Sequence, residues 1–191
     1  MRIPPVIFLS LFLTGLPIAA QTLAVEVCNF SRADHKMLTA AEAIARKAFQ
    51  DAGLETFWLT ADDPAHPGKV GPAKLRLLVY PGHPKRNDIT DAFGVAMTVA
   101  DQTASSLADV FFGNIEEVAT TRTDETLLLG YVMAHEVGHL LGMGHVPDTV
   151  MADGWTAHDI PRMQAGRVRF SRSQAERLRA AVALRLAKIQ R

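Results

Sequence analysis

The sequence predicts an α+β fold, in which a twisted mixed sheet of about four or five strands is covered by helices. Three observations lead to this fold class. Short apolar runs with strand character recur between residues 23 and 112, one amphipathic helical segment interrupts them, and two long helical patterns follow. The 191 residues, 48% hydrophobic and 21% charged, suit a single domain with its own core.

Residues 1–20 have the regions of a secretory signal peptide in the expected order. Arg2 provides a positive start, an apolar run follows, and small residues stand at Ala19 and Ala20. We therefore predict cleavage after Ala20 and a secreted or periplasmic mature domain of residues 21–191. A retained anchor is the alternative, but the run is shorter than the roughly 20 apolar residues that a spanning helix needs.

The mature chain begins with strand, helix, strand and strand. Ser31 or Asp34 can cap the helix, whose apolar residues recur at helical spacing until Gly53 ends it. Prolines and glycines between residues 62 and 72 predict a loop after the second strand. The three strands are expected at Leu23 to Phe30, Leu54 to Thr60 and Lys74 to Tyr80.

Two short strands and a central helix come next. The strands are expected over residues 92–99 and 108–112, after a polar loop over residues 81–91. Thr121 or Thr123 begins the helix, because carboxylates follow in its first turn, where they suit the positive end of the helix dipole.

The chain then becomes polar and irregular over residues 157–168 before a final helix over residues 170–191. A capping box at Ser171 or Ser173 marks the start of this C-terminal helix. Its outer face is basic, which is normal for a solvated amphipathic helix, although an acidic partner would also suit it.

The central helix ends in H-E-V-G-H-L-L-G-M-G-H, from His135 to His145. His135 and His139 share one helix face with Cβ atoms about 5 to 6 Å apart, a span that one zinc ion can bridge. Glu136 is rotated off that face, which places it as a base and not as a ligand. Gly142 can end the helix and turn the chain, so that His145 becomes a third ligand. Three protein ligands with an open fourth position are typical of catalytic Zn²⁺.

This run matches H-E-x-x-H-x-x-G-x-x-H, and by it the chain resembles the metzincin zinc metalloproteases. A V-M-A turn followed by a tryptophan, and an S-x-x-Q-A-E-R-L-R terminal helix, are similar to small secreted bacterial proteins of an uncharacterised metzincin-like subgroup. The resemblance implies a zincin-like domain with an active-site helix. It also implies that Met151 supports the ligand imidazoles from a Met-turn, and that Phe93 to Thr98 is an edge strand that pairs with substrate.

Two departures leave the subgroup open. The gap between His145 and Met151 is shorter than in many metzincins, and Met151 lacks the nearby tyrosine that some of them use. The alternative for Met151 is plain core packing, and the alternative for Phe93 to Thr98 is an ordinary protected strand.

The site predicts a secreted Zn²⁺-dependent endopeptidase that hydrolyses a protein or peptide substrate with Glu136 as general base. One alternative is a zinc hydrolase of a narrow non-protein amide or a cell-wall peptide. The other is a non-catalytic secreted binding domain that keeps zinc for stability.

Charge and cysteine content give further expectations. Twenty basic residues balance twenty acidic ones, so charge indicates neither a nucleic acid nor, after signal cleavage, a membrane partner. The single cysteine, Cys28, excludes an internal disulfide. It is expected as a buried small hydrophobe in the first strand, with zinc coordination in a latent form as the alternative. The oligomeric state stays open.

Overall fold

The computed structural model describes residues 22–60, 75–82, 92–97 and 106–189. The predicted signal peptide, the loop over residues 62–72 and most of the loop over residues 81–91 lie outside these ranges. Within the described part of the chain, none of the helices combines the length and apolar character that a bilayer crossing requires.

Five strands form one mixed sheet in the order β2-β1-β3-β5-β4. The strands are β1 (Thr22–Asn29), β2 (Glu55–Thr60), β3 (Leu75–Tyr80), β4 (Gly94–Ala96) and β5 (Leu107–Phe111). All neighbouring pairs are parallel except β4 with β5, which is antiparallel. The predicted mixed sheet of four or five strands is confirmed, and β4 forms one of its edges.

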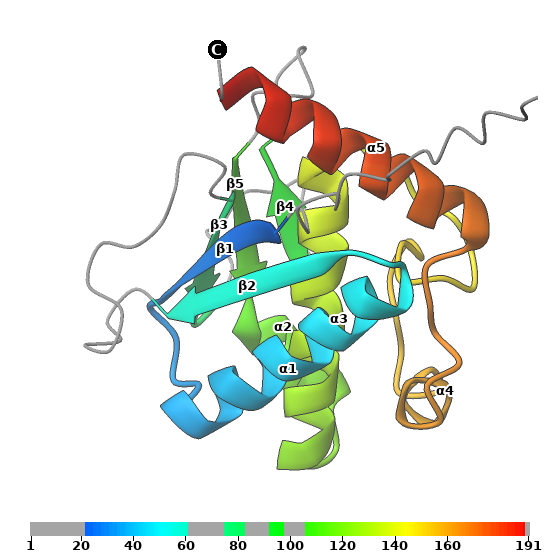
Figure 1. Ribbon diagram of the computed structural model, residues 1–191. Helices are drawn as coiled ribbons and strands as arrows, with labels where there is room; N and C mark the ends of the chain where they lie inside the picture. Colours follow the sequence, from blue (N-terminus) through cyan, green and yellow to red (C-terminus); the bar gives the residue numbers. More distant parts are fainter. Residues whose placement is uncertain (1–21, 61–74, 83–91, 98–105, 190–191) are drawn as a thin grey trace, which may run out of the picture.

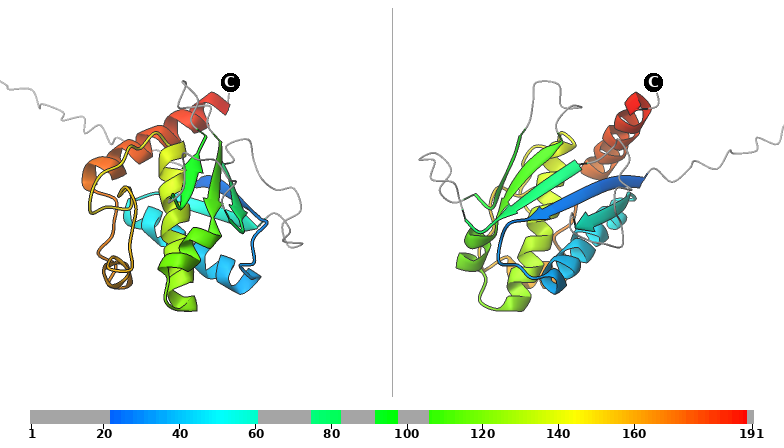
Figure 2. Two further views of the ribbon diagram at one scale, coloured as in Figure 1. Left: turned by 180° about the vertical axis from the view of Figure 1, so that it is seen from behind. Right: turned by 90° about the vertical axis from the view of Figure 1, so that its left-hand side faces the viewer.

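One face of the sheet forms the core, because alternate residues of the inner strands point toward the helices. These residues are fully buried: Leu23, Val25, Val27, Leu75, Leu77, Val79, Ala108 and Val110. Helices α1 (His35–Asp51) and α3 (Arg122–Leu140) pack together on this face, as Figures 1 and 2 show.

Two predicted caps begin the long helices. Of the two residues considered for α1, Asp34 is the cap, and its carboxylate accepts the Met37 N–H at 2.8 Å. Of the two considered for α3, Thr121 is the cap, and its hydroxyl accepts the Asp124 N–H at 3.1 Å. Gly53 adopts φ +75° just after α1, as a helix stop requires.

The sequence-based boundaries were wrong in three places. The last strand ends at Phe111, and Phe112 begins a short helix, α2 (Phe112–Val118), which the prediction omitted. Helix α4 (Ile160–Gln164) lies within the stretch expected to be irregular. Both helices have two turns or fewer, too short for a helical period to be recognised. Strand β4 is shorter than the predicted residues 92–99, whose last two lie outside the described residues.

The final helix, α5 (Arg172–Ile189), crosses one end of the molecule (Figure 1). Of the two capping boxes considered, the one that forms joins Ser171 and Gln174. On the face expected to be solvated, Arg179 donates a 2.6 Å hydrogen bond to the carbonyl of Ala52, after the end of α1. This bond connects two segments far apart in the sequence.

Candidate metal centre and cleft

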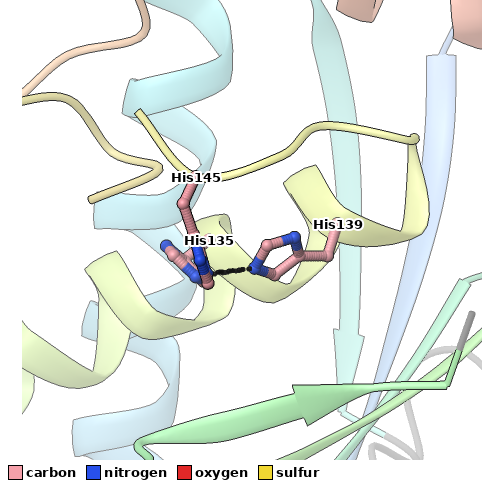
Figure 3. Close-up of side chains that lie close together, drawn as sticks. All are labelled: His135, His139 and His145. Carbon is pink, nitrogen blue, oxygen red and sulfur yellow. Dashed lines mark hydrogen bonds between the residues drawn. The ribbon is translucent and has the colours of Figure 1, made fainter. Parts of the chain in front are cut away.

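The last turn of α3 and the turn that follows it bring three imidazoles together, as Figure 3 shows. The Nε2 atoms of His135 and His139 lie 2.9 Å apart, and those of His139 and His145 lie 3.0 Å apart. Gly142 makes this possible, because its φ of +80° ends the helix and turns the chain back. The three residues that the sequence predicted as ligands therefore form a group that could hold one metal ion.

The other ring nitrogen of each histidine faces an oxygen. Nδ1 of His135 lies 2.8 Å from the Val150 carbonyl, and Nδ1 of His139 lies 2.8 Å from the Met143 carbonyl. A carbonyl can only accept, so each of these rings donates through Nδ1 and leaves an unprotonated Nε2 pointing to the centre. Nδ1 of His145 lies 3.6 Å from a carboxylate oxygen of Asp153. Such outer partners orient metal-binding histidines.

The electrostatics keep the two helical histidines neutral. Burial lowers the pKa of His135 to about 4, and the neighbouring His139 contributes to that shift. Burial also lowers the pKa of His139. Neutral imidazoles are the form that binds metal ions, so near neutral pH neither ring has to lose a proton first.

Met151 packs against α3 at Gly138, which lies in the sequence between the two helical histidines. It is fully buried, and a Cβ atom placed on Gly138 would overlap its Sδ atom. The glycine in the middle of α3 therefore allows the Met151 turn to approach the helix closely. The Met151 carbonyl accepts the N–H of Val146, the residue after the third histidine, at 2.7 Å.

Glu136 packs against the edge strand β4. Its side chain is 3% exposed, and a Cβ atom on Gly94 of β4 would lie 2.6 Å from its Oε1. Its Oε2 is buried without a hydrogen-bond partner among the described residues. Burial raises the pKa of Glu136 to about 8, and Asp109 adds to the rise. A cation held by the histidines would favour the charged form of this carboxylate.

The three histidines, Glu136 and Gly94 line one cleft of about 540 Å³ between β4 and the turn after α3. Trp155 forms part of its wall, stacked on Phe93 with centroids 6.4 Å apart and edge-on to His135 at 5.3 Å. A second hollow of about 420 Å³ shares this wall and is lined further by Asn114, Glu117 and Thr156, among others. The cleft thus runs along the sheet edge past the imidazoles.

The structure also contains site residues that the sequence analysis did not predict. Asp153 and Trp155 line the cleft, and Asn114 lines the adjoining hollow. The resemblance had included the tryptophan that follows the V-M-A turn, but not its place in the wall of the cleft. Cys28 lies in β1 as predicted, but it is half-buried and is not a member of the three-histidine group.

No protein-family model and no curated protein sequence matches the chain. Solved structures do. Archaemetzincin from Methanopyrus kandleri superposes with a TM-score of 0.62 and 16% identity, covering 88% of this chain and 99% of that one. A zinc-dependent peptidase from Methanocorpusculum labreanum gives a TM-score of 0.57 and 15% identity, covering 81% and 99%. The chain therefore has a zincin-like metallopeptidase fold, as the resemblance implied.

Proposed function

We propose that this chain is a secreted zinc-dependent endopeptidase, exported by the signal peptide predicted over residues 1–20. One observation carries the proposal: three imidazole nitrogens converge beside a buried carboxylate that lacks a partner among the described residues. A structural metal site would be closed and would not need this carboxylate. The two solved structures of the same fold, one described as an archaemetzincin and one as a zinc-dependent peptidase, support the proposal.

The residues present fit a zinc ion. His135, His139 and His145 would hold it, since two of the rings donate through Nδ1 and have no proton left for the short contacts between their Nε2 atoms. A tetrahedral site with Zn–N bonds of about 2.0 to 2.1 Å places its nitrogens about 3.3 Å apart, only a few tenths of an ångström beyond the contacts observed here. A bound zinc ion would activate water and polarise the scissile carbonyl.

Glu136 would act as the general base and then as the general acid. Its carboxylate would take a proton from the attacking water and return it to the leaving amine. Packing against Gly94 holds the side chain in place, and burial keeps bulk water away from it. The same packing puts the base beside the main chain of β4, where a substrate added to the sheet edge would pass.

The charge of the cleft favours a substrate with a cationic side chain. Apart from Glu136, whose charge a bound cation would offset, the described residues that line the cleft and the adjoining hollow include the acidic Glu117 and Asp153 and no lysine or arginine. The shared aromatic wall of Phe93 and Trp155 adds faces that attract cations. We therefore infer that peptide segments containing lysine or arginine near the scissile bond are preferred.

Cleavage of an unfolded protein mixture tests the function. The purified chain is incubated with zinc, with a chelator, and beside Glu136→Gln, which keeps the shape of the side chain but cannot accept the proton. We expect internal cuts, read as new peptide termini by mass spectrometry, that the chelator abolishes and Glu136→Gln reduces by at least about 100-fold. A folded, zinc-loaded chain that makes no cuts would contradict the proposal and favour a narrow-substrate hydrolase or a binding domain.

A further inference from the structure

Gln174, in the capping box of α5, makes a hydrogen bond that capping does not require. Ser171 and Gln174 bond reciprocally: the Ser171 N–H donates to Oε1 of Gln174 at 2.7 Å, and the Gln174 N–H donates to the Ser171 hydroxyl at 3.2 Å. This exchange uses the amide oxygen of Gln174 and leaves its Nε2 group free to donate elsewhere. The side chain is 4% exposed and its Nε2 donates to the Thr149 hydroxyl at 3.3 Å.

Thr149 lies at the centre of the turn between the third histidine and Met151. Its hydroxyl donates to the Val146 carbonyl at 2.8 Å and accepts the Met151 N–H at 3.0 Å. A hydroxyl has one proton and two lone pairs. With the bond from Gln174, all three are used, so the hydroxyl is completely satisfied within the protein.

This hydroxyl joins the two sides of the turn. Val146 follows His145 directly, and Met151 packs against Gly138, between the two helical histidines in the sequence. Val150, between Thr149 and Met151, supplies the carbonyl that faces Nδ1 of His135. The hydrogen bonds of Thr149 therefore hold the residue after His145 and the residue after Val150, whose carbonyl faces His135.

We propose that Gln174 is a positioning residue for the metal centre, acting through the Thr149 hydroxyl, in addition to capping α5. The inference rests on the proposed zinc site. The plain alternative is that Gln174 only caps the helix. The two roles use different atoms, since capping needs Oε1 and positioning needs Nε2, and one substitution separates them.

Glu at position 174 keeps the cap, because Glu and Gln serve equally in this box, but a carboxylate cannot donate. In Gln174→Glu the new carboxylate can only accept a hydrogen bond. The Thr149 hydroxyl would therefore donate to this carboxylate and no longer to the Val146 carbonyl. We expect zinc affinity, measured by competition with a chromophoric chelator, to fall about 10-fold. This is the low end of the cost of losing a direct outer partner of a metal ligand, because Gln174 acts one hydrogen bond further out. Substituted Co²⁺ should show an altered visible spectrum, which reports ligand geometry.

Two further substitutions test the same hydroxyl without changing the helix. Thr149→Val removes the hydroxyl at nearly constant shape and should reproduce the loss of affinity. Thr149→Ser retains the hydroxyl and should stay within about threefold of the unchanged chain, a difference well under 1 kcal/mol. Asp34→Ala is the matched control. It removes the cap of α1 and the ion pair with Arg122 at the start of α3, the end of that helix away from the histidines, so it should lower thermal stability and leave zinc affinity unchanged.

The results separate this inference from the proposed function. Zinc affinity in Gln174→Glu within twofold of the unchanged chain would overturn the positioning role, and so would equal losses in Thr149→Ser and Thr149→Val. Either result leaves chelator-sensitive cleavage by the unchanged chain intact. An unchanged chain that binds no zinc would instead overturn the proposed function, and this inference with it.

Discussion

The Sδ atom of Met151 occupies the space that a side chain on Gly138 would need. An α-helix interior disfavours glycine by roughly 0.5 to 1 kcal/mol relative to alanine, and Gly138 lies in the last turns of α3, between two of the histidines. The contact explains why glycine stands there. The turn that contains Met151 and helix α3 are therefore in close contact at Gly138.

We expect Gly138→Ala to destabilise the fold despite its better helix propensity. Displacing a fully buried methionine costs about 1 to 3 kcal/mol, as overpacking usually does, which exceeds the gain from alanine. Denaturant unfolding would measure the difference. Gly144→Ala is the matched control, because a Cβ atom there meets nothing within 4 Å. An unchanged or raised unfolding midpoint for Gly138→Ala would show that Met151 moves aside without cost.

His145→Ala should weaken zinc binding by at least about 100-fold while the chain stays folded, since the residue is exposed and contributes little to the core. Equilibrium dialysis against buffered zinc would measure the affinity. His158→Ala removes another exposed histidine, which lies outside the three-histidine group, and should bind zinc as the unchanged chain does. Equal affinity in both variants would remove His145 from the ligand set.

Asp124 should make stability depend on acid pH. Hydrogen bonds lower the pKa of this carboxyl below its usual value. The largest contribution comes from the hydroxyl of Thr121, the next from that of Thr120, and a smaller one from the amide of Gln164. A group with a lowered pKa stabilises the fold fully above the unfolded-state pKa, about 3.9, and this contribution is lost as the pH falls through the folded-state pKa. Unfolding curves of Asp124→Asn and the unchanged chain should therefore converge as the pH falls below about 4. A constant difference between them down to pH 2 would contradict the assignment.

Glu117→Gln should reduce the preference for basic residues that we infer from the cleft. The loss of one partly screened charge lowers selectivity by roughly 5-fold, or about 1 kcal/mol. Cleavage of an N-acetylated peptide library measures the preference and excludes recognition of a free amino terminus. Glu116→Gln is the matched control, because Glu116 lies on the same helix but pairs with Arg32 and does not line the hollow. Identical profiles for both variants would exclude Glu117 from substrate recognition.

The fold class and the three histidines could be predicted because both depend on local patterns. Alternating apolar residues mark a strand. The spacing from His135 to His145, with Gly142 between them, predicts a helix that ends in a turn and so brings the histidines together. The helices α2 and α4 were not predicted, because they are too short for their residues to show a helical period. The positions of Asp153 and Glu117 along the cleft depend on how separate segments pack, which a local pattern does not contain. The same is true of the bond from Gln174 to Thr149, although the capping box itself was predicted.

The position of α5 affects when the site is completed during synthesis. His135, Glu136 and His139 leave the ribosome before the 18 residues of α5. Those residues supply the bonds from Arg177 to the carbonyl of Gly142 and from Arg179 to that of Ala52. An unfinished chain therefore carries every predicted ligand but lacks the bond from Arg177 to the turn after α3 and the bond from Arg179 to the end of α1. Under the proposed function, catalytic competence would then come late, once the last helix has docked.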